Sequence, residues 1–86
     1  MTELIQEGFK ELTSKYDIKV NIKSKRTFSL FVLEDVPLEV KNEVHSIVQS
    51  ICDNTGRKVF TVDNPFIKTR DNGSYVTAGI WDIRIY

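Results

Sequence analysis

Cysteine is almost absent from this chain of 86 residues, in which Cys52 is the only one. A single cysteine excludes an intramolecular disulfide. Long apolar runs are absent as well. None approaches the roughly 18 residues that a membrane-spanning helix needs, and Met1 leads into a charged amphipathic segment rather than an apolar signal. We therefore expect a soluble protein of the cytoplasm that does not bind a membrane.

Residues that commonly carry catalysis or bind metals are also scarce. His45, the only histidine, lies seven positions before Cys52, which on a helix is about 10 Å along the axis, too far to share one metal ion. With one histidine, any general base would have to be a carboxylate. The four glycines are scattered and form no phosphate-binding loop. The sequence therefore predicts no cofactor, no metal and no enzymatic activity.

Two acidic patterns bear on the remaining enzyme class, a metal-dependent nuclease. Glu39-Val40-Lys41 has the E-x-K spacing of some of these enzymes, but it falls in the first turns of an expected helix, where the side chains cannot point as they do from a strand. Asp17 and Asp53 each close an expected helix, where an aspartate commonly serves the turn. A nuclease is therefore the least favoured reading.

No sign of charge dominates the chain, because 12 lysines and arginines balance 12 aspartates and glutamates. Such a chain has no global field for nucleic acid or an anionic membrane, so a polyanion would have to meet a local cluster. The expected helices carry an excess of glutamate that would make the helical side acidic: Glu3, Glu7, Glu11, Glu39 and Glu43.

The first third of the chain reads as a helix followed by a hairpin. Ile5, Phe9 and Leu12 lie on one helical stripe, which Tyr16 continues. Strict alternation from Ile18 to Ile22 predicts a half-buried strand. After a turn, an apolar strand from Phe28 to Glu34 returns antiparallel to it.

A second helix and a second hairpin follow. We expect Asp35 to cap the helix and Gly56 to end it, since glycine accepts the left-handed conformation found just past helix ends. Its core stripe comprises Val40, Val44, Ile47, Val48 and Ile51. The first strand of the hairpin runs from Lys58 to Val62 and resumes from Phe66 to Arg70, with an extra short strand as an option around Asn64.

The hairpin turn of this second unit is Asp71-Asn72-Gly73, the clearest turn signal in the chain. The last strand, Tyr75 to Tyr86, changes its alternation near Gly79, where we expect a bulge. If the bulge turns the strand over, Tyr75 and Trp81 lie on opposite faces and one aromatic remains outside the core.

The order of elements is therefore α-β-β-α-β-β, and we expect one α+β domain over residues 1–86. The two α-β-β units should form a four-stranded antiparallel sheet with two helices on one face. In element order this resembles a circularly permuted ferredoxin-like sandwich. A fold of this kind does not determine a function.

The strand from Phe28 to Glu34 is apolar on both faces, although a sheet covered by helices on one side needs only one apolar face. Phe28, Leu30 and Val32 alternate with Phe31 and Leu33. The second face should therefore contact a partner, and the predicted partner-binding residues are Phe31, Leu33, Tyr75 and Trp81. Homodimerisation through this face or through a sheet edge remains open.

Basic residues gather at the two expected hairpins. The set comprises Lys19, Lys23, Lys25, Arg26, Lys68 and Arg70. If the two hairpins hold equivalent positions, these cations share one surface that contacts phosphates. The alternative is that they keep the protein soluble and the sheet edges unpaired. No aromatic residue lies within the turn at residues 23–26 to stack a base.

The function predicted from the sequence is thus a small non-enzymatic protein-interaction module. Its size suggests a phage or mobile-element accessory protein that binds and inhibits a host factor. The alternative is a nucleic-acid-binding domain that uses the basic hairpins.

Overall fold

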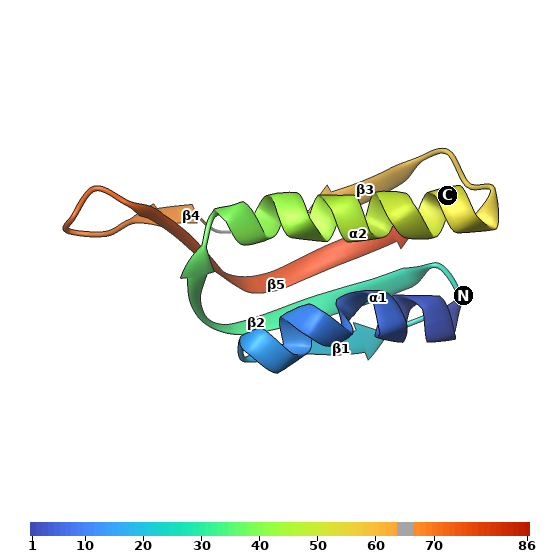
Figure 1. Cartoon of the computed structure of the whole chain (residues 1–86), viewed down its shortest axis with the longest axis horizontal. Helices are drawn as coiled ribbons and strands as arrows, with labels where there is room; N and C mark the ends of the chain where they lie inside the picture. The colour runs from blue at the N-terminus through green and yellow to red at the C-terminus, as the bar shows by residue number, and fades with distance from the viewer. Residues whose placement is uncertain (64–66) are drawn as a thin grey trace.

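A computed structural model describes residues 1–63 and 67–86 of the chain (Figure 1). The elements follow one another as α1 (Thr2–Lys15), β1 (Ile18–Ile22), β2 (Thr27–Pro37), α2 (Glu39–Thr55), β3 (Phe60–Asp63), β4 (Ile67–Thr69) and β5 (Tyr75–Ile85). The α+β class and the order of helices and hairpins are as expected from the sequence. The optional strand around Asn64 lies outside the described residues.

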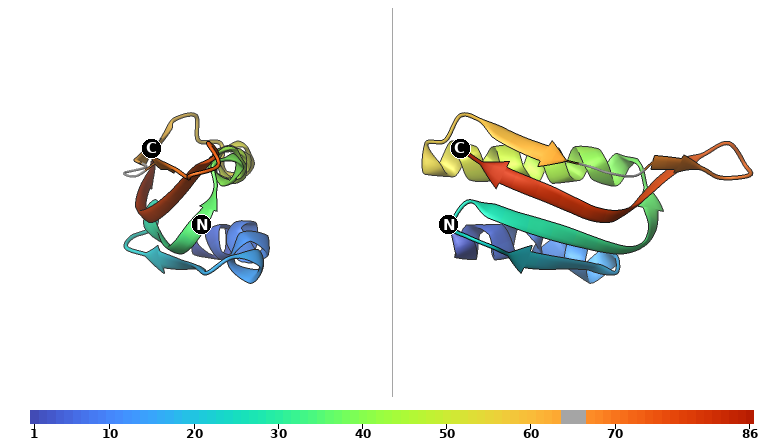
Figure 2. Two further views of the ribbon diagram at one scale, coloured as in Figure 1. Left: turned by 90° about the vertical axis from the view of Figure 1, so that its left-hand side faces the viewer. Right: turned by 180° about the vertical axis from the view of Figure 1, so that it is seen from behind.

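The strands form one antiparallel sheet in the order β1-β2-β5-β3, and β4 pairs with β5 beyond the end of β3. The sheet has five strands rather than four, because the first strand of the second hairpin is divided into β3 and β4. Both helices cover the same face of the sheet, as the end-on view shows (Figure 2). The likeness to a permuted ferredoxin-like sandwich stays a prediction from element order.

The core lies between the helices and this face of the sheet. The stripe of α1 buries Ile5, Phe9 and Leu12, and α2 buries Val40, Val44, Val48 and Ile51. The sheet contributes Phe28, Leu30, Trp81 and Ile83 from its two central strands, all at most 1% exposed. Burial of one such side chain contributes about 1.5–3 kcal/mol, so the central strands β2 and β5 supply much of the stability.

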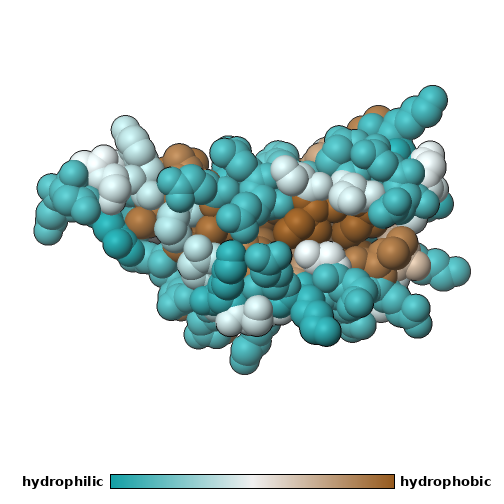
Figure 3. Space-filling model, in the orientation of Figure 1, coloured by the Kyte–Doolittle hydropathy of each residue, from teal (hydrophilic) through white to brown (hydrophobic). Residues whose placement is uncertain are grey.

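The two helices approach each other closely at Gly8. A Cβ atom at this position would lie 3.0 Å from Cγ2 of Ile47 and 3.4 Å from Cδ1 of Ile51. The glycine therefore permits close packing, which offsets its unfavourable helix propensity of about 1 kcal/mol. Figure 3 shows an apolar stripe between the helices on this side of the molecule.

The connection between β2 and α2 differs from the expectation. Strand β2 continues to Pro37, and the N-cap of α2 is Leu38, without a hydrogen bond from its side chain. Asp35 is therefore not a helix cap; it lies in β2 and its carboxylate pairs with Lys68 of β4 at 2.9 Å. The expected helix end is confirmed, because Gly56 caps α2 at a φ of 70°.

The ladder between β2 and β5 is irregular beside Gly79, but the additional residues belong to β2. Val32 pairs with Gly79, and the next pair is Val36 with Thr77. Three residues of β2 thus face one residue of β5. Gly79 has a φ of 98°, a conformation that other residues rarely adopt. The change of phase expected at this glycine coincides with a bend in both central strands.

The molecule is elongated, with extents of 42 × 22 × 18 Å. The β4–β5 hairpin projects beyond α2 at one end of the long axis, and the β1–β2 turn lies at the other end (Figure 1). The projecting turn is held by the N–H of Arg70 donating to the carbonyl of Ser74 at 2.8 Å, with Gly73 at a φ of 83°. Within the described residues, neither helix is long and apolar enough to cross a membrane.

Candidate functional site

The face of the sheet opposite the helices carries a row of side chains across three strands. Lys19 of β1 pairs with Phe31 of β2, which pairs with Ile80 of β5. The N–H of Ile85 donates to the carbonyl of Arg26, so these two residues form a hydrogen-bonded pair. Such pairs recur at every second residue of an antiparallel ladder, so the even-numbered residues of β2 up to Val32 are hydrogen-bonded to β5. Phe31 and Ile80 therefore form a non-hydrogen-bonded pair, whose Cα atoms lie about 4.5 Å apart. Their side chains are close cross-strand neighbours.

Three apolar residues on this face form what we call the open-face patch: Phe31, Leu33 and Ile80. Leu33 is 56% exposed and Ile80 is 50% exposed, while Phe31 is half-buried. In contrast, Phe28, Leu30 and Val32 on the other face are at most 3% exposed. The expected division of this strand into a core face and a second apolar face is confirmed for Phe31 and Leu33. Ile80 was not among the predicted site residues, because only the strand register places it opposite Phe31.

A polar network borders the open-face patch. Asp82 accepts hydrogen bonds from Oγ of Ser29 at 2.6 Å and from Nζ of Lys23 at 3.3 Å. The hydrogen bond from Ser29, followed by that from Lys23, holds the pKa of the Asp82 carboxyl below its usual range. Asp82 therefore remains ionised beside the patch, although Asp63 lies directly opposite it on β3.

The two predicted aromatic contacts, Tyr75 and Trp81, do not join this patch. Trp81 is 0% exposed within the core, so the prediction that it contacts a partner is wrong. Tyr75 is 57% exposed, but it lies five positions from Ile80 along β5, which is about 16 Å in an extended strand. It lines a cleft of about 770 Å³ with Leu38 and Glu39 at the start of α2. Tyr75 is therefore the aromatic left outside the core, but on a different surface.

The six predicted cations do not share one surface. The β1–β2 turn carries Lys23, Lys25 and Arg26, whereas Lys68 and Arg70 lie on the hairpin at the opposite end of the long axis (Figure 1). Lys19 lies between these groups, on the open face beside Phe31. The equivalence of the two hairpins was the wrong premise, because β2 and β5 run antiparallel and their turns point in opposite directions.

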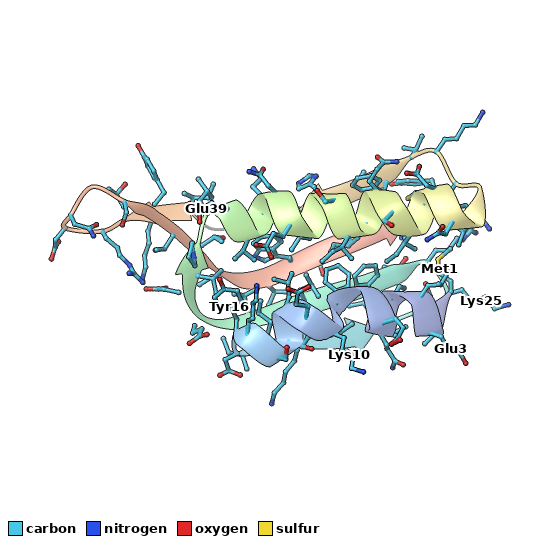
Figure 4. The ribbon with its side chains drawn as sticks, in the orientation of Figure 1. Met1, Glu3, Lys10, Tyr16, Lys25 and Glu39 are labelled. Atoms are coloured by element: carbon cyan, nitrogen blue, oxygen red, sulfur yellow. The ribbon has the colours of Figure 1, made fainter. Side chains whose placement is uncertain are left out.

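Other cations join the β1–β2 turn instead, and we call this group the basic end. It consists of Lys23, Lys25, Arg26, Arg57, Lys58 and Arg84. Arg84 pairs with Thr27 at the start of β2. Nη1 of Arg57, just after α2, donates to the carbonyl of Tyr86 at 3.4 Å. Figure 4 shows Lys25 at this end of the molecule, where Met1 also lies.

Sequence reasoning missed the last three members of the basic end because they come from segments far from the first turn. Arg57 and Lys58 follow α2, and Arg84 lies near the end of the chain. One signal was available for Arg84: it has the same alternation as Asp82, opposite to the core residues Ile83 and Ile85. Only the pairing of β2 with β5 shows which turn it adjoins.

Two neighbouring clefts mark the basic end. The first has a volume of about 370 Å³ and is lined by Ser24, Arg26, Thr27, Arg84, Ile85 and Tyr86. The second, of about 260 Å³, shares Thr27, Arg84 and Tyr86 with it and also contains Lys23, Asp63 and Asp82. The guanidinium of Arg84 lies 6.0 Å from the centre of the Tyr86 ring, and Tyr86 is 52% exposed.

The two remaining candidates for chemistry, Cys52 and His45, both lie on α2. Cys52 is buried, and burial, with a smaller effect of Asp53, raises the pKa of its thiol. His45 packs near Phe60, with ring centres 6.1 Å apart. Among residues 1–63 and 67–86, no three histidine, cysteine, aspartate or glutamate side chains are grouped so that they could hold a metal ion.

No family model matches the chain, and neither a curated protein nor a solved structure matches it.

Proposed function

We propose that this protein is a small non-enzymatic protein-interaction module that binds another protein through the open face of its sheet. The observation that supports the proposal is the open-face patch. Phe31, Leu33 and Ile80 are apolar and adjacent, and Leu33 and Ile80 are exposed while Phe31 is half-buried, although the core of the domain lies on the other face. Contiguous apolar groups on a surface commonly mark an interaction site.

The patch alone is small for a stable interface. A typical specific interface buries about 800 Å² on each partner, and its apolar centre is surrounded by a polar rim. The exposed side chains of Lys19 and Asp82 border the patch and supply such a rim. The partner should therefore present an apolar group to the patch, a carboxylate to Lys19 and a donor to Asp82.

Two kinds of protein partner fit this surface. A second copy would place two open faces together and bury both patches, whereas a different protein would cover one face. The sequence predicts an accessory protein that inhibits a host factor. Such a protein needs a rigid exposed surface that a different protein can cover. We favour a different protein, because the inhibition of a host factor that is predicted from the sequence requires one.

The proposal is tested by comparing Leu33→Glu with a matched control, Val59→Glu. Leu33 and Val59 are 56% and 57% exposed, and neither belongs to the core, so both variants should remain folded. A tagged protein is used to capture partners from extracts, and mass spectrometry identifies them. We expect a partner that both wild type and Val59→Glu retain and that Leu33→Glu and Ile80→Glu lose.

Sedimentation of the purified protein separates the two kinds of partner. A monomer at high micromolar concentration would exclude the second copy. Retention of the same partners by Leu33→Glu and Ile80→Glu would contradict the use of the open face, whatever the partner is.

A further inference from the structure

The cleft between Arg26 and Arg84 combines two kinds of group that recognise nucleotides. Both arginines are exposed, and the planar guanidinium is suited to binding phosphate through paired hydrogen bonds. Tyr86 in the same cleft presents an aromatic ring that is half exposed. Among the described residues, no aspartate or glutamate lines this cleft, in contrast to its neighbour with Asp63 and Asp82 and to the cleft beside Glu39.

Five of the six cations of the basic end form no ion pair with another described residue. Among the described residues, Lys25, Arg26, Arg57, Lys58 and Arg84 take part in no ion pair, and Lys23 pairs with Asp82. At the other end of the molecule, Lys68 is neutralised by Asp35 at 2.9 Å. The chain as a whole has no net charge, so this distribution gives one end a local positive field.

We propose that the basic end binds single-stranded nucleic acid, with a phosphate between Arg26 and Arg84 and a base stacked on Tyr86. Lys25, Arg57 and Lys58 contact neighbouring phosphates as the strand leaves the cleft. Asp63 and Asp82 direct the backbone away from the second cleft. This site lies at one end of the molecule and does not depend on the binding of a protein to the open-face patch.

A single strand fits the basic end better than a duplex. The cations are carried by a turn, a strand end and the segment after α2, and within the described residues neither α1 nor α2 presents a basic side that could enter a groove. The helices instead expose glutamates, including Glu3 and Glu39, which are labelled in Figure 4 at opposite ends of the helical side. A rigid duplex that crossed this side would meet like charge, whereas a flexible strand reaches the cleft and exposes its bases to Tyr86.

The test measures fluorescence anisotropy with short labelled DNA and RNA oligonucleotides over a series of salt concentrations. For a single strand, each phosphate contact contributes about 0.7 to the slope of log affinity against log salt. The double variant Arg26→Ala/Arg84→Ala removes the one phosphate contact that the two arginines share, and should therefore reduce the slope by about 0.7. The matched variant Lys68→Ala/Arg70→Ala removes the same charge from the other end and should leave the slope unchanged.

The stacking contact is tested separately. Tyr86→Ala should weaken binding roughly 5- to 150-fold, as expected for the loss of one stacked base, and Tyr86→Phe should retain most of the affinity. Tyr75→Ala, which removes an equally exposed tyrosine from the other end, is the control and should have no effect. The backbone hydrogen bond from Tyr86 to Val59 remains in all of these variants.

Four results would overturn the proposal. They are no binding at the lowest salt, equal losses from both double variants, tighter binding of duplex than of single strands, and displacement by polyglutamate as effective as displacement by an oligonucleotide of equal charge. The last result would assign the basic end to an acidic protein segment. None of them would alter the outcome for Leu33→Glu, so the two proposals fail independently.

Discussion

The two hairpins occupy the same place in the order of elements, but they end in different surroundings. The β1–β2 hairpin lies along α1, and its strands remain part of the sheet up to the turn. The β4–β5 hairpin leaves the body, and its inner strand passes from the core into solvent. Trp81 in the middle of β5 is 0% exposed, whereas Tyr75 at its start is 57% exposed. One strand therefore has two environments.

The physical cause of this difference lies at the junction of β2 and β5. Strand β2 has three residues between Val32 and Val36 where β5 has one, and Gly79 has a positive φ beside them. Such an irregularity bends a strand and increases its twist. The strand beyond it pairs with the short β4, in which all three residues are exposed. A small change in backbone geometry thus converts a second core hairpin into a projecting arm.

The largest effect is expected from comparing the two aromatic residues of β5. Trp81→Ala should reduce the free energy of unfolding by about 3–5 kcal/mol, because a fully buried indole leaves a cavity among its neighbours. Tyr75→Ala should change it by less than about 0.5 kcal/mol, since this side chain is mostly exposed. Urea unfolding followed by circular dichroism measures both values. Similar losses for the two variants would show that the arm and the body are stabilised as one unit.

An intermediate effect is expected from two glycines with positive φ. Gly79→Ala should lower the free energy of unfolding by about 1–3 kcal/mol, because a φ of 98° is strained for alanine at a junction held by β2. Gly73→Ala imposes a similar strain at a φ of 83°, but in a turn with no atom within 4 Å of the new Cβ.

Hydrogen exchange separates these two outcomes. Gly73→Ala should increase exchange at the amides of Arg70 and Gly73, whose hydrogen bonds close the turn, and leave the slowest core amides unchanged. Gly79→Ala should accelerate exchange in the core. A loss of core protection in Gly73→Ala would mean that the arm contributes to global stability.

The smallest effect is expected from the hydrogen bonds that Ser29 and Lys23, near the β1–β2 turn, donate to Asp82. Ser29→Ala should raise the pKa of the Asp82 carboxyl toward its usual range, because the hydrogen bond from Ser29 is the main cause of its lowered pKa. A lowered pKa stabilises the folded state above the usual Asp pKa of about 3.9, and this contribution is lost as the pH falls through the folded value.

The stability difference between wild type and Ser29→Ala should therefore be present at neutral pH and shrink on acidification. NMR titration of the carboxyl carbon of Asp82 gives the pKa directly. Lys23→Ala should produce a smaller rise than Ser29→Ala, since the hydrogen bond from Lys23 is the lesser cause. A larger rise for Lys23→Ala would contradict the assignment of the main cause to Ser29.

Much of the fold follows from local patterns in the sequence. The helical stripe with Phe9 and the alternation of β1 predict their elements, because burial of one face requires those periods. Gly56 and the turn at Asn72-Gly73 are confirmed as a helix end and a hairpin turn, since their backbone conformations are local properties. The exposure of Leu33 also follows from alternation within a single strand.

The candidate sites depended on contacts that no local pattern contains. Which of Tyr75 and Trp81 is buried depends on where β5 passes the start of α2, and the partner of Phe31 depends on the β2–β5 register. The assembly of the basic end from the first turn, the segment after α2 and the end of β5 likewise requires the strands to be paired in the sheet. Periodicity thus determined by itself which residues share a face of one element. Only the tertiary structure decided which faces, turns and charges meet, because long-range strand pairing joins segments whose separation in sequence carries no such signal.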